Sequence, residues 1–299
     1  MPVDTNAPVD AVASVPDDAD ALRGFHFKRL LRLPLTRVLL ALFVLVAGIG
    51  VAAASTAPLG LIAAVAALGV GVGVVFWIAD ARAAESFFEA YAQQRELVLD
   101  GRSDLPAATP LLRKGDKRYA ERTLTGLLGE RVGGILALYT YEQQSTDGQG
   151  STQTNYYRYT LGLTEVPECI DHLPELYCQR KSGLRSLERF EDVFRRSKQR
   201  LKLESAALDK RYEIFAGKSQ DAVWLRRLFT PTFIVWLSES APDKFAFELV
   251  DGTLCCYVSG HKEDAADLDA IAAATAEITR RLRDESTESA AAGPEQATT

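Results

Sequence analysis

The sequence predicts an α+β protein in which an N-terminal transmembrane helical hairpin precedes a cytoplasmic domain of antiparallel strands and helices. The first observation is that residues 38–79 contain no Asp, Glu, Lys, Arg or His. The second is that strand-like runs rich in Tyr, Ile, Leu and Thr lie downstream, separated by turn sequences. The third is that these runs do not alternate with helical segments in βαβ order, so we expect an antiparallel sheet.

Charge is distributed in blocks along the 299 residues, whose net charge is −6. Residues 1–20 carry five Asp and no cation, residues 21–37 carry five cations and no acid, and residues 284–299 carry four acids and no cation. We interpret residues 1–21 and 284–299 as disordered ends and residues 22–37 as a basic juxtamembrane segment. The acidic balance argues against a nucleic-acid-binding protein. Four cysteines in so long a chain exclude a small disulfide-stapled fold.

The uncharged stretch, residues 38–79, is long enough to cross a bilayer twice. One crossing needs about 20 apolar residues at 1.5 Å rise each, and Ser55-Thr56-Ala57-Pro58 forms a natural turn at its centre. We expect spans over residues 35–54 and 59–79, both helical because hydrocarbon offers the backbone no hydrogen-bond partner. Residues 84–99 keep a helical pattern, so the second span is expected to continue as one long helix.

The flanking charges predict the orientation of this hairpin. Five cations precede the first span, Arg82 follows the second, and the turn between them carries none. Because Lys and Arg are retained on the cytoplasmic side, we expect a multi-pass protein of the inner (plasma) membrane with both termini in the cytoplasm. Phe76 and Trp77 fit the aromatic belt at the inner interface.

Two further features of the membrane region have alternative interpretations. The cations of the basic segment alternate with Phe and Leu, so they can contact anionic lipid or serve only to fix the topology. They include Arg23, Lys28, Arg29 and Arg32. The small-residue spacings in the two spans allow close helix approach, either within the hairpin or in a homo-oligomer. These spacings are Gly69-x-x-x-Gly73, with Gly71 between, and Gly48-x-x-x-Ala52.

Residues 80–283 are expected to form one cytoplasmic domain. Its predicted strands are two hairpins, of residues 131–144 with 152–166 and of residues 245–250 with 253–259, together with residues 173–180 and two short extended pieces within 201–215. Its predicted helices are residues 182–198, 219–228, 232–237 and 264–283, with Thr230-Pro231 as a helix start. Residues 105–116 read as a loop and residues 145–151 as the polar tip of the first hairpin.

The first hairpin carries a group of tyrosines that can pair across its strands: Tyr139, Tyr141, Tyr156, Tyr157 and Tyr159. The group has two interpretations. Aromatic residues are good strand formers, which favours packing within the sheet. The alternative is a binding surface.

Several segments resemble a family of bacterial membrane-anchored proteins of unknown function. They are residues 203–222, with their Glu-Ser start and Phe-centred strand, and the helix start Leu228-Phe-Thr-Pro-Thr-Phe. Residues 118–129, Tyr139-Thr-Tyr and residues 159–167 are similar to the actinobacterial branch of that family. The sequence departs from the family pattern at Leu208 and Tyr212, where phenylalanines are usual. The resemblance implies a membrane hairpin followed by a cytoplasmic α+β domain, and it implies no functional residue.

Motifs for known chemistry are absent from the sequence: there is no phosphate-binding loop, nucleophile elbow or His-Glu-x-x-His helix. Cys and His are the usual zinc ligands, and Cys169, His172 and Cys178 lie close in sequence, with Cys255-Cys256 elsewhere. Their spacing fits no standard ligand pair, and adjacent cysteines on a strand would point to opposite faces. We therefore predict no catalytic, cofactor-binding or metal residue.

Two classes of function remain open. The favoured one is a non-enzymatic inner-membrane protein whose cytoplasmic domain binds a partner protein or a membrane surface. The alternative is a membrane-tethered enzyme or zinc-dependent protein that uses Cys169, His172 and Cys178.

Overall fold

A computed structural model describes residues 41–47, 49, 53, 57–146, 148, 150–181, 198–203, 205–220 and 222–291. The acidic segment 1–21, the basic segment 22–37, much of the first predicted span and the predicted helix 182–198 lie outside these ranges, apart from Lys198. The chain divides into two compact units, Met1–Tyr91 and Ala92–Thr299. Each unit is described by itself.

The first unit is dominated by the long helix α3 (Ala57–Gln94), which has 38 residues. Pro58 lies in its first turn, where a missing N–H is tolerated. The prediction that residues 59–79 continue into one long helix is confirmed as helical structure, and the domain boundary expected after residue 79 falls inside this helix. Residues 41–47 are also helical, but the described residues do not show a two-helix hairpin.

The end of α3 is a Schellman motif. Glu96 takes a positive φ of 53°, and Leu97 N donates to Ala92 O at 2.9 Å while Glu96 N reaches Gln93 O at 3.4 Å. The helix therefore stops at Gln94, five residues before the end that periodicity alone predicts.

The second unit is built on one nine-stranded sheet with the order β1-β2-β3-β4-β9-β8-β5-β7-β6. Every neighbouring pair is antiparallel, which confirms the α+β class. The strands are β1 (Val98–Asp100), β2 (Lys117–Gly129), β3 (Val132–Thr146), β4 (Thr152–Glu165), β5 (Glu175–Arg180), β6 (Lys198–Leu201), β7 (Tyr212–Gly217), β8 (Ala246–Val250) and β9 (Thr253–Ser259).

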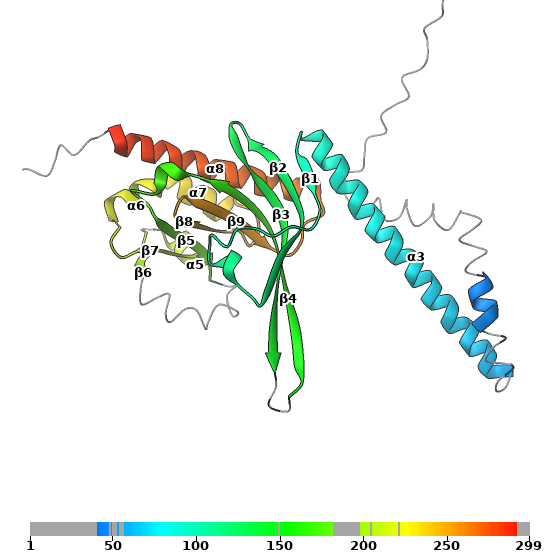
Figure 1. The fold of residues 1–299 in the computed structure, drawn as a ribbon. Coiled ribbons are helices and arrows are strands. Elements are labelled where there is room, and N and C mark those ends of the chain that lie inside the picture. The colour runs from blue at the N-terminus through cyan, green and yellow to red at the C-terminus, as the bar shows by residue number, and fades with distance from the viewer. Residues whose placement is uncertain are drawn as a thin grey trace, which may run out of the picture. The chain divides into compact units, whose positions relative to one another are not determined.

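Both predicted hairpins are present. Strands β3 and β4 pair from Ile135↔Leu163 to Thr146↔Thr152, and their outer ends project beyond the sheet as a two-stranded ribbon (Figure 1). Strands β8 and β9 are joined by Asp251 and Gly252, whose φ values of 46° and 79° fit a type I′ turn.

The helices of the second unit are α5 (Ala206–Arg211), α6 (Ala222–Leu228), α7 (Pro231–Glu239) and α8 (Ala265–Ala291), with short 3-10 turns η1 (Leu111–Arg113) and η2 (Pro167–Cys169). The predicted start of α7 is confirmed, because the Thr230 hydroxyl accepts a hydrogen bond from Phe233 N at 3.3 Å. Strand β7 matches one of the two short extended pieces predicted within residues 201–215, and the prediction missed helix α5, which precedes that strand. Its cap is Ser205, whose hydroxyl accepts from Leu208 N.

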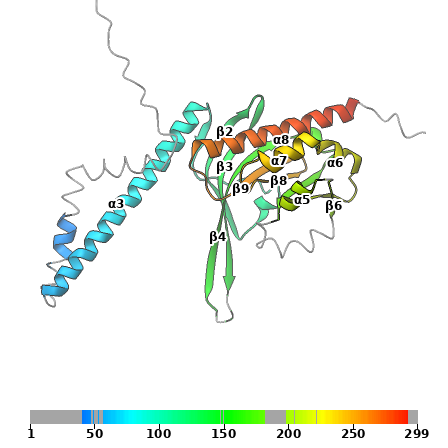
Figure 2. The same ribbon diagram turned by 180° about the vertical axis from the view of Figure 1, so that it is seen from behind.

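The two faces of the sheet are covered differently. Helix α8 crosses one face (Figures 1 and 2), and Gly162 on β4 makes room for the Thr275 side chain, which a Cβ would strike. On the other face, Leu111 and Leu112 of η1 are buried in a cluster of side chains from the sheet. That cluster includes Ala137, Tyr139, Leu161, Leu163, Cys255 and Tyr257.

Helix α8 continues to Ala291, which corrects the expectation of a disordered end from residue 284. Arg227 explains part of the extension, because it pairs with Glu285 at 3.0 Å and with Glu288 at 3.3 Å. Ser286 is buried on the same stretch. These tertiary contacts, which a polar sequence does not reveal, hold the last turns in place.

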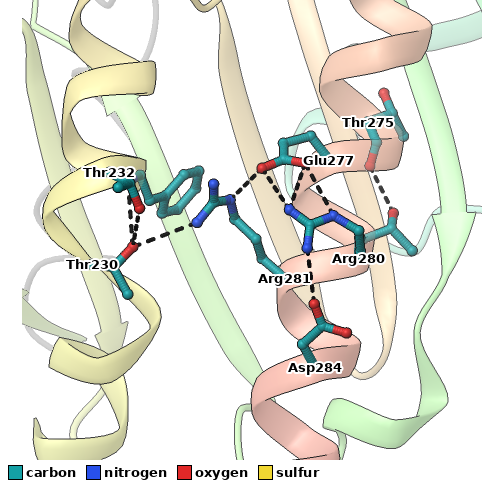
Figure 3. A network of polar contacts seen from close by, with 9 residues as sticks. Thr230, Thr232, Thr275, Glu277, Arg280, Arg281 and Asp284 are labelled. Carbon is teal, nitrogen blue, oxygen red and sulfur yellow. Dashed lines mark hydrogen bonds and ion pairs between the residues drawn. The ribbon is translucent and has the colours of Figure 1, made fainter.

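Helices α7 and α8 are joined by the network in Figure 3. The Arg281 guanidinium donates to Glu277 at 2.6 Å and to the Thr230 hydroxyl at 3.5 Å. It also lies over the Phe233 ring at 4.8 Å. The contacts are structural, because they fix the start of α7 against the middle of α8.

Candidate functional site

The surface of α3 is the first feature that suggests a function. The helix is long and apolar enough over residues 65–94 to cross a membrane, and 17% of its most apolar window is buried. Most large apolar side chains from Ile62 to Trp77 are exposed, with Trp77 71% exposed, whereas Phe87, Phe88 and Tyr91 near the end of the helix are buried. A core helix of a soluble protein would bury most of these side chains, so this helix lacks the packing that a core requires.

The small-residue spacing on α3 has no close packing partner among the described residues. A Cβ placed at Gly69 or Gly73 would meet nothing within 4 Å among the described residues. The structure therefore does not show these glycines packing a hairpin.

The Cys/His cluster is not assembled as a metal site. Cys169 lies in η2 under α8, with its Sγ 3.2 Å from the Ser286 hydroxyl, and Cys178 lies in β5. Both thiols are buried, whereas His172 is exposed. Within the described part of the chain, no group of three or more His, Cys, Asp or Glu side chains could hold a metal ion.

The pair Cys255-Cys256 points to opposite faces, as predicted. Cys256 lies in register with Phe247, which lies in register with Cys178, so these three side chains share a face. Burial raises the pKa of the Cys178 and Cys256 thiols. They therefore stay protonated at neutral pH, and a protonated, buried thiol is neither a ready nucleophile nor a ready ligand.

Glu248 on β8 is a buried carboxylate that sequence reasoning missed. It is 1% exposed, and it accepts hydrogen bonds from Leu111 N at 2.9 Å and from the Tyr257 hydroxyl at 3.3 Å. Burial raises its pKa, against the opposing effects of the Leu111 hydrogen bond and of Lys114. The carboxyl ties η1 to the sheet and is closed to solvent, so we assign it a structural role.

The tyrosines of the first hairpin mostly pack. Tyr139 and Tyr141 are buried, and the Tyr141 ring stacks on that of Tyr157 at 4.8 Å. The Tyr159 ring meets that of Tyr257 edge to face at 5.8 Å. Tyr156 is exposed. The packing interpretation therefore accounts for most of the group.

A polar pocket of about 600 Å³ lies where β5, α5 and α7 meet. It is lined by Arg180, Ala207, Lys210, Arg211, Ser238, Glu239 and Asp243. Sequence reasoning missed this pocket. Its residues come from three separated segments, and one of these is the unpredicted helix α5.

The pocket has a defined polar geometry. Arg180 pairs with Asp243 at 3.0 Å, and Arg211 donates to the backbone oxygen of Ser238. The Ser238 hydroxyl and Arg180 Nε are buried without a hydrogen-bond partner among the described residues. The pocket therefore combines three cations with unused donors, an arrangement that can hold an anion.

Comparison with known proteins yields little. No model of a protein family matches this chain, and no curated protein matches it. The chain is similar to the crystal structure of the mycobacterial trehalose monomycolate transport factor A, TtfA, at 12% sequence identity and a TM-score of 0.42. The similarity covers 68% of this chain and 94% of that one. A likeness of this size establishes neither a family nor a function, so the resemblance to an actinobacterial family stays a prediction.

Proposed function

We propose that this chain is an integral protein of the inner (plasma) membrane whose α+β domain is a binding module on the cytoplasmic side. The observation that supports the proposal most is the exposed apolar surface of α3. Contact of such a surface with water is unfavourable by about 25 cal/mol for each Å². Contact with lipid tails removes that cost, and the helical backbone satisfies its own hydrogen bonds there.

The proposed topology is multi-pass, with both termini in the cytoplasm. The length of the uncharged residues 38–79, about twice what one crossing needs, supports two spans. The cations before the first span and Arg82 after the second favour this orientation. In this arrangement Arg23, Lys28, Arg29 and Arg32 lie at the inner leaflet, where they can contact anionic lipid.

A binding role is favoured over catalysis by the state of the reactive groups in the described residues. The cysteine thiols are buried, Glu248 is sealed beneath η1, and the one pocket described above holds cations and hydrogen-bond donors. The open glycines Gly69 and Gly73 suggest in addition that α3 self-associates in the membrane.

The topology is tested with reporters fused at the two ends of the chain. A cytoplasm-dependent reporter placed before Met1 and another placed after Thr299 should both be active. A single crossing by α3 would place the two ends on opposite sides, and activity at only one end would overturn the hairpin.

Membrane integration is tested by alkaline extraction of membranes. The full chain should stay in the membrane fraction, and a variant lacking residues 38–79 should be released. Equal retention of the two proteins would overturn the proposal, as would recovery of the full chain from water as a monomer without detergent.

A further inference from the structure

The pocket between β5, α5 and α7 has a net positive lining. Three cations, Arg180, Lys210 and Arg211, face two acids, Glu239 and Asp243. Asp243 is already paired with Arg180 and is 80% exposed. Within the described residues, Lys210 and Arg211 have no carboxylate partner, so their charge is available to a ligand.

The shape of the lining suits an oxyanion with several oxygens. An Arg guanidinium presents its N–H groups as a planar fork that matches carboxylate and phosphate, and Lys adds a compact charge. Arg211 is held in place by its bond to the Ser238 backbone oxygen. That bond leaves other donors of the guanidinium available and orders the side chain before a ligand arrives.

The buried Ser238 hydroxyl is the second observation that favours an anion in this pocket. The residue is 5% exposed, and within the described part of the chain its oxygen has no hydrogen-bond partner. Buried polar groups are nearly always paired, so each exception calls for an explanation. Arg180 Nε, in another residue of the lining, also has no hydrogen-bond partner among the described residues. Both atoms are donors, so the lining carries unused hydrogen-bond donors beside its cations.

We infer that the pocket lined by Arg180, Lys210, Arg211 and Ser238 binds the phosphate group of a phosphorylated ligand. Two unpaired cations match the double charge of a phosphate monoester. A volume of about 600 Å³ exceeds what phosphate alone would occupy and lies in the range of small-molecule sites. The rest of the ligand meets Ala207 and the carboxylate of Glu239, which can accept a hydrogen bond from a hydroxyl group.

The phosphate can belong to a soluble compound or to a lipid headgroup, since the chemistry of recognition is the same. The inference deepens the binding role proposed above, but it does not depend on the number of membrane crossings. A negative result in the topology experiment would not affect the inference about the pocket. A negative result in the phosphate titration would not affect the proposed membrane anchor.

The test uses the full chain in nanodiscs of phosphatidylcholine and measures binding of inorganic phosphate by equilibrium dialysis at constant ionic strength. Saturable binding of one phosphate per chain is expected. Arg211→Gln should weaken it by about tenfold or more, because it removes a charged hydrogen-bond donor. Lys218→Gln is the matched control, since Lys218 is exposed and lies outside the pocket. Absence of saturable binding, or equal affinity in Arg211→Gln and the control, would overturn the inference.

Ser238→Ala separates a ligand-binding hydroxyl from a structural one. Because the hydroxyl has no partner among the residues that the structure describes, its removal should leave the melting temperature unchanged or raised without phosphate, while phosphate affinity falls several-fold. Lower stability with unchanged affinity would contradict the inference. Should Arg211→Gln fail to fold, Lys210→Gln removes a second cation of the same lining at an exposed side chain.

The source of the phosphate is distinguished by repeating the titration in nanodiscs that contain phosphatidic acid. A lipid headgroup in the pocket would compete, so the phosphate affinity of the wild type would fall more than that of Arg211→Gln. An equal change in both proteins indicates a soluble ligand. Either result supports the site, whereas no saturable binding in either kind of disc overturns it.

Discussion

Phe76 on α3 and Phe247 on β8 are the same residue type in opposite surroundings. The first is 52% exposed and the second is 0% exposed. Phe247 lies within the packed core of the second unit, where apolar side chains turn inward away from water. On α3 most large apolar side chains from Ile62 to Trp77 turn outward, which fits the apolar surroundings proposed above. The comparison teaches that the exposure of an apolar side chain has to be judged against the solvent that its surface faces.

The largest expected effect comes from truncating the buried ring of the two. Phe247→Ala should lower the free energy of unfolding of the domain by about 3–5 kcal/mol, because it leaves a cavity in a packed core. Phe76→Ala, the matched control, should change it by less than about 0.5 kcal/mol. Chemical denaturation of the full chain in detergent micelles measures both. Similar losses for the two variants would break the distinction between the regions.

Glu248 extends the comparison between buried and exposed side chains to a polar residue. Glu248→Ala should cost about 2–3 kcal/mol, because the Leu111 N–H and the Tyr257 hydroxyl lose their acceptor inside the core. Asp100→Asn, at an exposed position of β1, is the control and should change stability little. Urea denaturation measures both variants. An unchanged free energy of unfolding in Glu248→Ala would show that solvent reaches this group.

The same carboxyl predicts a pH dependence. Burial raises the pKa of Glu248 above its ordinary value of 4.5, so the folded state holds the proton more tightly than the unfolded chain does. Its contribution to stability is therefore largest below that ordinary value and is lost as pH rises through the folded-state pKa. Glu248→Gln should flatten this part of the stability profile. The free energy of unfolding is measured by urea denaturation at a series of pH values. The same dependence on pH in Glu248→Gln as in the wild type would contradict the assignment.

The next effect concerns the turn between β8 and β9. Gly252 has a φ of 79°, and an added Cβ would lie 3.0 Å from the Ile170 side chain. Gly252→Ala should therefore cost about 1–2 kcal/mol. A Cβ added at Gly133 would meet no atom within 4 Å among the described residues, so Gly133→Ala should be neutral or stabilising. Thermal unfolding compares the two, and equal losses would contradict the assigned strain.

The smallest effect is expected at the tip of the β3–β4 ribbon. Deleting residues 147–150 should cost less than about 1 kcal/mol, since it sacrifices the exposed Thr146–Thr152 pair and no core contact. Soluble yield and melting temperature report the outcome. A collapse in yield would mean that the tip is packed.

The parts of the fold that the sequence predicted have local causes. The Asp251-Gly252 turn and the Thr230-Pro231 helix start are each specified by neighbours in sequence, and both lie in the described structure as expected. Of the uncharged stretch, the structure shows residues 57–79 as helix but does not show the predicted hairpin. Strand β2 was missed because Lys117, Arg118, Glu121 and Arg122 obscure its alternation. Helix α5 has six residues, too few for a periodic signal.

The polar sites could not be predicted for a related reason. A single Glu in the strand pattern around residue 248 suggests the solvent face, and only η1, far away in sequence, turns that position into a core site. The pocket joins the end of β5 to α5 and α7 without any motif. For Cys169, His172 and Cys178 the sequence raised a hypothesis of metal binding that burial and separation of the side chains do not support.

The order of elements along the chain has a consequence for biosynthesis. Strands β4 and β9 pair although Tyr159 and Ser259 are 100 positions apart, and α8, which covers that face, follows them both. At about 5–20 residues per second, α8 leaves the ribosome a few seconds after β9. During that interval the face of the sheet that α8 later covers is exposed and prone to aggregation, so we expect chaperones to protect it at this stage.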